Sequence, residues 1–232
     1  MRYHDRSFSL PTGRKFLLRQ VVAFVASIDQ LASLEGGLLV DVGCGHKPYE
    51  KLFRRYRYLG VDAFTDISSP DVAAQVTAIP IRAGSVDACM TVWVLDDLSE
   101  PEVAIKELSR ILKTGGHYFA VEAQWAHQHF PPHDYFRFAP NALAHLCKKH
   151  ALELVSCTSY GGDFAVIGFS LIHLAGIVNA RLGLLGGALT AISHLVVNCL
   201  FAPLDRIARL SIFHGCFETN SVGYCYVFRK LL

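Results

Sequence analysis

The chain has 232 residues, of which 22 are basic and 20 acidic, so its formal net charge is +2. Charged residues make up 18% and apolar residues 52%, against roughly 25% charged residues in an average soluble domain. This balance excludes a disordered, collagen-like or coiled-coil protein, and the bulk charge predicts no nucleic-acid partner. The seven cysteines form no Cys-x-x-Cys pair, which favours a reducing compartment over a disulfide framework or a structural zinc site.

Helical and extended patterns alternate along the chain. Apolar residues at helical spacing predict helices, and short apolar runs bounded by glycine or charged residues predict strands. The first apolar stretch is interrupted by Arg19 and Gln20, so we do not expect it to be a signal peptide. In chain order, the expected elements are a helix over 14–34, a strand over 38–42, a helix over 48–55, strands over 58–61 and 86–95, a helix over 102–112 that ends at residues 113–116, a strand over 117–121, a helix over 141–150, and strands over 152–158 and 222–228. Such alternation predicts an α/β fold built on a mostly parallel sheet.

The segment from Leu39 to Pro48 is the most informative part of the sequence. A buried strand runs into Gly43-Cys44-Gly45, where glycines let the backbone turn sharply and approach a ligand closely. A predicted helix follows, and its first N–H groups are free to bind an anion. Asp62 ends the next strand, where a carboxylate can accept both hydroxyl groups of a ribose. This pattern indicates a cofactor that contains adenosine.

The turn itself helps to choose between cofactors. A dinucleotide-binding turn has a third glycine three residues after the second, but that position is Pro48 here. Asp41 lies two residues before the first glycine, where its carboxylate can meet an ammonium group. S-adenosylmethionine has such a group and a nicotinamide cofactor does not. A plain strand–turn–helix corner is the alternative explanation when the glycine pair is considered alone.

Further segments resemble those of one family. These are LLVDVGCGHKPY (38–49), YLGVD (58–62), AQVTAIPIRAGSVDA (74–88), VLDDLSEPEVAIKELSRILKTGGHYFAVEA (94–123), HDYFRFAPNAL (133–143) and VGYCYVFRK (222–230). In their order and spacing they resemble a class I S-adenosylmethionine-dependent methyltransferase of the bacterial methyltransferase-domain type. The resemblance implies a Rossmann-like, doubly wound seven-stranded sheet with an antiparallel last strand. It also implies three parts: an N-terminal helical segment (1–35), a methyltransferase domain (36–162 and 217–232) and an apolar helical insertion (163–216).

The resemblance also assigns roles to residues at the turn. Asp41, Gly43, Cys44 and Gly45 would line the methionine end of S-adenosyl-L-methionine, and Asp62 would hold the ribose. Gln75 and the backbone of Val76 would flank the adenine. Three positions depart from the family pattern: Lys47 stands at the usual third glycine, Gln75 at a frequent acidic residue, and Asp96-Asp97 at a frequent Glu-His pair. These departures concern cofactor affinity more than the fold.

The loop after the strand over 117–121 holds the candidate catalytic residues. Parallel strands present ligands with their carboxyl ends, so His129, His133 and Asp134 are expected at the site, and a histidine suits the role of general base. Two other interpretations stay open. The histidines of this loop could bind a metal, although the sequence supplies no further ligands, so we expect none. Asp134 could instead pair with Arg137 and hold the loop in place.

Residues 164–204 contain Arg181 as their single charged residue. The uncharged stretches 164–180 and 182–204 predict a helical hairpin that bends near residues 181–187 and is close in length to a bilayer's thickness. Thr190, His194 and Asn198 recur every four residues and would form one polar stripe. A hairpin that faces protein on one side and lipid on the other fits this pattern, whereas a buried hairpin or a dimer interface is the soluble alternative. As an insertion between the last two strands, it would lie beside the mouth of the active site.

These observations predict a methyltransferase that acts on a small-molecule or lipid-linked, apolar acceptor. It would lie on the cytoplasmic side, at a membrane surface, without a nucleic-acid partner. Two alternatives differ in class: a non-catalytic membrane protein that retains the fold, and a nicotinamide-dependent oxidoreductase, against which Pro48 counts. The sequence does not specify the acceptor atom or the oligomeric state.

Overall fold

The computed structural model of the chain describes residues 15–30, 36–66, 68–128, 131–182, 184–208 and 221–231. These residues form a seven-stranded sheet with the strand order β3-β2-β1-β4-β5-β7-β6. The strands are β1 (Leu38–Val42), β2 (Arg57–Asp62), β3 (Val72–Ala73), β4 (Val86–Val92), β5 (Leu112–Ala123), β6 (Leu152–Tyr160) and β7 (Gly223–Lys230). Neighbouring strands from β3 to β5 pair in parallel, whereas β7 pairs antiparallel with both β5 and β6. The predicted mostly parallel sheet with an antiparallel last strand is confirmed.

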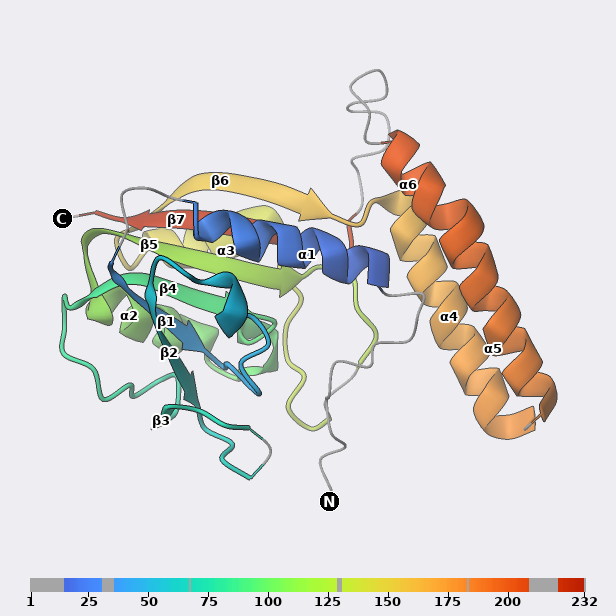
Figure 1. Cartoon of the computed structure of the whole chain (residues 1–232), viewed down its shortest axis with the longest axis horizontal. Coiled ribbons are helices and arrows are strands. Elements are labelled where there is room, and N and C mark those ends of the chain that lie inside the picture. Colours follow the sequence, from blue (N-terminus) through green and yellow to red (C-terminus); the bar gives the residue numbers. More distant parts are fainter. Residues whose placement is uncertain are drawn as a thin grey trace.

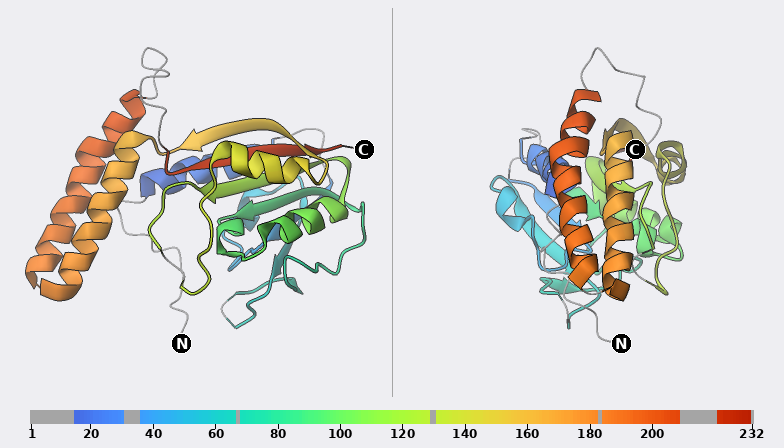
Figure 2. Two further views of the ribbon diagram at one scale, coloured as in Figure 1. Left: turned by 180° about the vertical axis from the view of Figure 1, so that it is seen from behind. Right: turned by 90° about the vertical axis from the view of Figure 1, so that its right-hand side faces the viewer.

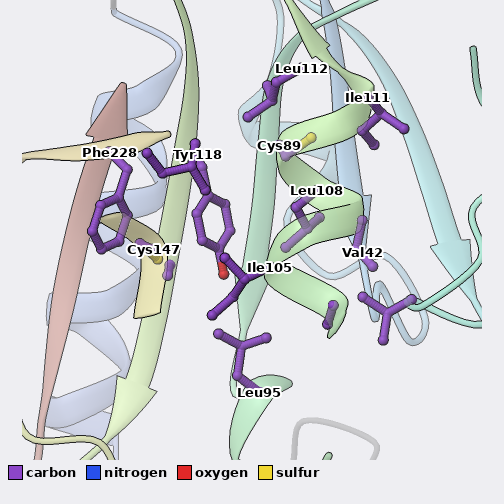
Figure 3. Packing of buried hydrophobic residues seen from close by; sticks show 14 of the residues in the cluster. Val42, Cys89, Leu95, Ile105, Leu108, Ile111, Leu112, Tyr118, Cys147 and Phe228 are labelled. Carbon is purple, nitrogen blue, oxygen red and sulfur yellow. The ribbon is translucent and has the colours of Figure 1, made fainter. Parts of the chain in front are cut away.

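Helices cover both faces of this sheet (Figures 1 and 2). On one face α1 (Lys15–Ile28) buries Val21, Val25 and Ile28 against residues of β1, β4 and β5. The other face is covered by α2 (Pro101–Ile111) and α3 (Pro140–Lys148). There Ile105 and Leu108 of α2 pack with Tyr118 of β5 and other fully buried side chains (Figure 3). Both faces are therefore apolar and buried, as expected for strands that carry helices on both sides.

The boundary between α2 and β5 differs from the prediction. Residues 113–116 were expected to form a stop after the helix, but they belong to β5, which begins at Leu112 directly after α2. Gly115 takes a positive φ of 77° within this strand. The amine of Lys230 donates hydrogen bonds to the carbonyls of Ser109 and Leu112 at 2.6 and 2.8 Å. This cation satisfies carbonyls at the end of the helix, so no loop is needed there.

The predicted helix over 48–55 is wrong, because only the short 3₁₀ helix η3 (Glu50–Leu52) forms there. The carboxylate of Asp29 accepts the backbone N–H groups of Arg54 and Arg55, both at 3.0 Å, which holds this segment in a turn. Tyr49, Phe53 and Tyr56 turn inward and join the core beneath α1. The glycine turn therefore lacks a long helix whose N-terminus would bind an anion. The first helix is also shorter than predicted, and residues 31–35 of that prediction lie outside the described residues.

A long helical hairpin stands at the edge of the sheet where β6 ends and β7 begins (Figure 1). It consists of α4 (Asp163–Leu182), α5 (Leu184–Val196), the π-helical turn η5 (Val197–Phe201) and α6 (Ala202–Ala208). The helices α4 and α5 lie side by side in front of the domain in the right-hand view of Figure 2. Asp205 caps the start of α4, because its carboxylate accepts the N–H groups of Gly162 and Ala165.

Two helical stretches in this hairpin are long and apolar enough to cross a membrane, judged by length and composition. They are Asp163–Arg181 and Gly187–Ala208, and only 22% and 17% of their most apolar windows are buried within the chain. A core helix of a globular protein is mostly buried, so these helices leave an unusual amount of apolar surface exposed. The proposed division of the chain into three segments stays a prediction.

Candidate cofactor and acceptor site

The glycine turn brings the end of β1 next to the end of β2. The N–H of Gly43 donates to the carbonyl of Val61 at 2.8 Å, and Gly43 and Gly45 have φ angles of 75° and 53°. A Cβ on Gly43 would lie 2.5 Å from a methyl carbon of Val94, whereas a Cβ on Gly45 would meet no heavy atom within 4 Å. Gly43 is therefore needed for packing, and the space beside Gly45 is open for a ligand.

Asp41 lies buried at the carboxyl end of β1. The hydroxyl of Tyr58, on the neighbouring strand β2, donates a hydrogen bond to its carboxylate. Burial, together with a smaller contribution from the charge of Asp62, raises the pKa of Asp41 to about 7 despite that hydrogen bond. A cationic ligand group beside this carboxylate would favour its ionised form. This position suits the predicted role of Asp41 in binding an ammonium group, which stays a prediction.

Asp62 stands across the turn from Asp41. One of its carboxylate oxygens accepts the N–H of Gly45 and the other accepts the N–H of Phe64, both at 2.9 Å. Each oxygen keeps a second lone pair, so the carboxylate can still accept hydroxyl groups while its direction is fixed by the backbone. The structure therefore brings the two predicted carboxylates together around the glycine turn.

Lys47, at the position of the family's third glycine, keeps a positive φ of 54°. Its amine forms an ion pair with Asp71 at 2.8 Å, and Asp71 also accepts the N–H of Gly60. A Cβ on Gly60 would lie 2.8 Å from the Cys44 sulfur and 2.9 Å from the Lys47 stem. Gly60 thus makes room for a lysine at a position that usually needs a glycine. Cys44 is buried, which raises the pKa of its thiol to about 12.

Gln75 and Val76 lie just after β3, with Ala74 between. Ala74, the residue before them, donates its N–H to the carbonyl of Asp62 at 3.0 Å, which places Gln75 close to the end of β2. The side chain of Gln75 is exposed, whereas that of Val76 is buried in the core. This arrangement leaves the Gln75 amide available to a ligand, while Val76 can contribute only its backbone.

The loop after β5 forms the opposite side of the site. Arg137 organises it: the guanidinium binds both carboxylate oxygens of Asp134 at 2.6 and 3.1 Å, and it donates to the carbonyls of Ala126 and His127. The Asp134 side chain is only 3% exposed. This geometry favours the locking role of Asp134, whose catalytic role stays a prediction. His133 is exposed, and His129 lies outside the described residues.

Two buried carboxylates lie where β4 and β5 end. Glu122 of β5 is fully buried and accepts the N–H of Leu95 at 3.3 Å. Burial and the nearby Asp96 raise the pKa of Glu122 well above the ordinary value. The backbone carbonyl of Asp96 accepts the N–H groups of Tyr135 and Phe136 at 2.9 and 3.0 Å. These contacts attach the loop to the short 3₁₀ helix η4 (Leu95–Asp97). The sequence prediction did not single out Glu122, although a carboxylate within an apolar strand was a usable signal.

Trp93 lies between the glycine turn and the hairpin. It follows β4 with a positive φ of 55°, which is uncommon for a bulky residue. Its indole N–H donates to the hydroxyl of Tyr160, at the end of β6, at 2.8 Å. Burial raises the pKa of Tyr160, which keeps this hydroxyl neutral. Trp93 is thus fixed in place at the base of the hairpin, whereas Tyr135, on the loop after β5, is 47% exposed.

Aromatic stacking connects the loop after β5 to the hairpin. The imidazole of His127 stacks on that of His173, with ring centroids 3.7 Å apart, and on the ring of Phe169 at 5.3 Å. Both partners lie on α4, one helical turn apart. Within the parts of the chain that the structure describes, no three His, Cys, Asp or Glu side chains gather in a way that could hold a metal ion.

Comparisons with known proteins agree with this geometry. Residues 40–120 match the model of the methyltransferase domain family. A mouse tRNA (carboxymethyluridine(34)-5-O)-methyltransferase is 27% identical over 107 residues, covering 40% of this chain and 16% of that protein. A ubiquinone biosynthesis O-methyltransferase of Cupriavidus pinatubonensis is 27% identical over 161 residues, covering 55% of this chain and 65% of that protein. This chain contains a methyltransferase domain.

Solved structures share the fold of this methyltransferase domain. A proposed methyltransferase of Bacillus halodurans aligns with a TM-score of 0.59 at 12% identity, over 92% of this chain and 100% of that one. A Burkholderia thailandensis 1,6-didemethyltoxoflavin-N1-methyltransferase with bound S-adenosylhomocysteine aligns with a TM-score of 0.57 at 11% identity, over 98% and 82%. The domain and its neighbours indicate S-adenosyl-L-methionine as the cofactor. The matched segments span less than two thirds of the first curated relatives, so those relatives' substrates are not assigned to this chain.

The residues at the glycine turn fit that cofactor. Asp41 would bind the ammonium group, Asp62 would bind the ribose, and the open space beside Gly45 would allow a close approach to the backbone. The sheet also argues against a nicotinamide cofactor, because a dinucleotide-binding sheet is parallel with the order 3-2-1-4-5-6. Here the antiparallel strand β7 lies between β5 and β6. The predicted roles of individual residues in binding stay predictions.

Proposed function

We propose that this chain is an S-adenosylmethionine-dependent methyltransferase that acts on an apolar, lipid-borne acceptor at a membrane surface. The observation that carries the apolar acceptor is the hairpin, which begins three residues after β6 ends, at the ligand edge of the sheet. His127 of the loop after β5 (residues 124–139), which we call the acceptor loop, stacks on the hairpin. An uncharged, exposed surface beside the site suits an acceptor that stays in a membrane. The curated relatives named above methylate other substrates, and their acceptors do not decide this one.

The bound cofactor would supply a methyl group on a positively charged sulfur, a leaving group that is already activated. The protein's main task is then to align the acceptor with that methyl group and to keep water out. Asp41 and Asp62 would orient the cofactor. Arg137, through its bonds to Asp134 and to the loop carbonyls, would hold the acceptor side in place. An oxygen or nitrogen acceptor also has to lose a proton, for which His129 and His133 are the proposed bases.

The membrane surface is part of the same proposal. The hairpin would attach the enzyme on the cytoplasmic side through apolar contacts rather than charge. Burial of apolar side chains contributes roughly 25 cal/mol per Å² and is not weakened by salt, whereas attachment by charge is screened. We therefore expect the protein to stay with membranes during a high-salt wash and to be released by detergent. Recovery in the soluble fraction as a well-behaved monomer or dimer would contradict this part.

Methyl transfer can be tested directly. The protein is incubated with S-adenosylmethionine carrying a tritiated methyl group and with lipid extracted from membranes, and radioactivity is counted in the organic phase. We expect label in that phase with the native protein and much less with Asp62→Ala at the same cofactor concentration, set below saturation. Label confined to the aqueous phase would reject the lipid-borne acceptor. Cofactor binding without any transfer would favour the alternative, a membrane protein that retains the fold without catalysis.

A deletion variant separates the two halves of the proposal. Replacing residues 164–204 with a short glycine-serine linker should release the protein from membranes but leave cofactor binding intact, because the glycine turn and Asp62 lie outside the hairpin. Titration of the variant with S-adenosylmethionine by calorimetry measures this. Loss of cofactor binding would show instead that the hairpin is part of the domain core, since Ala165, Ile172 and Val197 are buried in the cluster beneath α1.

A further inference from the structure

The hairpin has two chemically different sides. On α5, the side chains of Leu189, Ile192 and Leu195 are 47%, 57% and 63% exposed. At 100° per residue, the centre of this apolar row lies about 160° around the helix from the polar row of Thr190, His194 and Asn198. The polar row lines an open depression on the helix surface together with Gly187 and Ala191, and Leu195, at the edge of the apolar row, borders it. The helix is therefore amphipathic, although it carries no charge.

The helix α4 shows the same division over residues 167–174. Ile167 and Leu174, seven residues apart on one face, are 52% and 58% exposed. Phe169 and His173 lie about 130° around the helix from them and stack on His127 of the acceptor loop. One side of α4 thus contacts the methyltransferase domain, and the opposite side is apolar and uncovered. Because α4 and α5 lie side by side in front of the domain (Figure 2), their uncovered sides form one broad outward face.

The same contacts limit how far the hairpin can enter a membrane. Since His173 must remain beside the acceptor loop, only the nine residues from Leu174 to Leu182 of α4 can extend beyond the domain. At 1.5 Å per residue they reach about 13 Å, whereas the hydrocarbon core of a bilayer is about 30 Å thick. Length and composition alone permit two membrane spans, but the packing of α4 against the domain leaves too little free helix for either.

The charges match a surface position as well. The outward face carries no charged residue between Asp163 and Asp205 except Arg181, which is exposed at the tip of the hairpin. Arg206, near the other end, is also exposed. Arginines at the two ends of an uncharged face can bind lipid phosphates while the side chains between them enter the acyl region. Trp125 and Tyr135 of the neighbouring loop, both 47% exposed, are residue types that favour the headgroup level.

We propose that the α4–α5 hairpin lies flat in one leaflet of a lipid bilayer, with its outward apolar face among the acyl chains and the acceptor loop at the headgroup level. The inference rests on the membrane attachment within the proposed function and makes it specific: the enzyme is monotopic and does not span the membrane. The acceptor would reach the site sideways from the same leaflet, and its reacting group would lie at headgroup depth.

Tryptophan substitutions test which side enters the lipid. Ile192→Trp on the outward face and Asn198→Trp on the polar side are compared in the full-length protein. The protein is bound to vesicles of phosphatidylethanolamine and phosphatidylglycerol with brominated acyl chains. After subtraction of the parent signal, we expect about twofold quenching for Ile192→Trp and little for Asn198→Trp, because interfacial helices bury one face only. Equal quenching of both would overturn the flat orientation.

The position of the tip provides a second test. Arg181→Cys is labelled with a membrane-impermeant maleimide after the protein has been added to the outside of sealed vesicles, with the parent protein as control. We expect labelling from the outside. Protection that ends only when detergent opens the vesicles would show that the hairpin spans the bilayer and would overturn the inference.

A second copy of this chain is the other candidate to cover the outward face. Light scattering distinguishes these occupants. The inference is rejected if the protein is a dimer that does not bind vesicles and Ile192→Lys makes it monomeric. Calorimetry with S-adenosylmethionine on the same variants reports on the methyltransferase itself. Selective quenching together with absent methyl transfer would reject only the proposed catalysis, whereas methyl transfer by a protein that fails the quenching test would reject only the flat hairpin.

Discussion

On the β1–β2 side of the ligand edge, two glycines hold positive φ angles and Asp62 accepts two backbone N–H groups. On the β4–β5 side, geometry depends on side-chain contacts: Arg137 bonds to carbonyls of its own loop, and His127 of that loop stacks on α4. The cofactor side is thus specified mainly by backbone conformation, which few sequences can adopt. The acceptor side is specified by side-chain contacts that can change without loss of the fold. One domain can therefore keep its cofactor while its acceptor varies.

The largest expected effect concerns Asp41, which lies on the cofactor side. Ionisation of its buried carboxyl group destabilises the folded protein. In the folded protein its pKa is about 7, against about 3.9 in an unfolded chain. The folded state therefore holds the extra proton between these values, and stability falls as the pH rises from 4 to 7. Asp41→Asn should remove this pH dependence. Its free energy of unfolding, relative to that of the native protein, should therefore rise by about 4 kcal/mol between pH 4 and pH 8. Urea unfolding at both pH values measures the difference, and a constant difference would contradict the assignment.

A pair of glycine substitutions isolates the packing at the turn. Gly43→Ala combines an unfavourable positive φ with a clash against Val94, so it should cost about 3 kcal/mol of stability and abolish cofactor binding. Gly36→Ala is the matched control, because Gly36 has a similar φ of 76° but open space around its Cβ position. It should cost about 1 kcal/mol. Equal losses in thermal unfolding would show that the contact with Val94 has no effect.

Substitutions on the acceptor side should lower the methylation rate rather than the affinity for the cofactor. If His129 or His133 is the base, its replacement by alanine should lower the methylation rate about 100-fold, the lower range for general base catalysis. S-adenosylmethionine affinity, measured by calorimetry, should hardly change. Normal turnover by both variants would assign the loop a structural role.

Asp62→Ala should show the opposite pattern. Loss of its charge-assisted hydrogen bonds to the ribose should weaken cofactor binding by about 1–3 kcal/mol. The affinity of Asp62→Asn should lie between those of the native protein and Asp62→Ala, because the amide can still accept a hydrogen bond with its oxygen. Calorimetric titration gives the three affinities, and an unchanged value for Asp62→Ala would remove this residue from the site.

The smallest effect is expected at the contact between loop and hairpin. His173→Phe keeps a planar ring against His127, whereas His173→Ala removes it. We expect the alanine variant to lose roughly tenfold in turnover, since a misplaced loop misaligns the acceptor, and the phenylalanine variant to remain close to the native protein. Identical rates for both variants would indicate that the stack does not position the loop.

The sequence predicted the sheet well and the site unevenly. Strands such as 38–42 could be located because buried parallel strands are continuous apolar runs. The two-residue strand β3 is too short to leave a pattern. The helix over 48–55 failed because the carboxylate of Asp29, more than 20 residues away, captures its backbone N–H groups. Asp41 and Asp62 were predictable because they belong to a local motif. His127 was not, because its role depends on a stack with α4 that only the folded chain creates.

The position of β7 has a consequence for how the molecule folds. This strand fills the gap between β5 and β6, yet it follows the hairpin in sequence. The sheet therefore cannot close until the whole hairpin has been synthesised, and β6 has no partner strand before then. Pairings that join distant segments form slowly, and during that interval the apolar helices have no completed domain beside them. If the chain is synthesised close to a membrane, its hairpin could bind the membrane before β7 inserts into the sheet. The last strand would then complete the domain at the membrane surface.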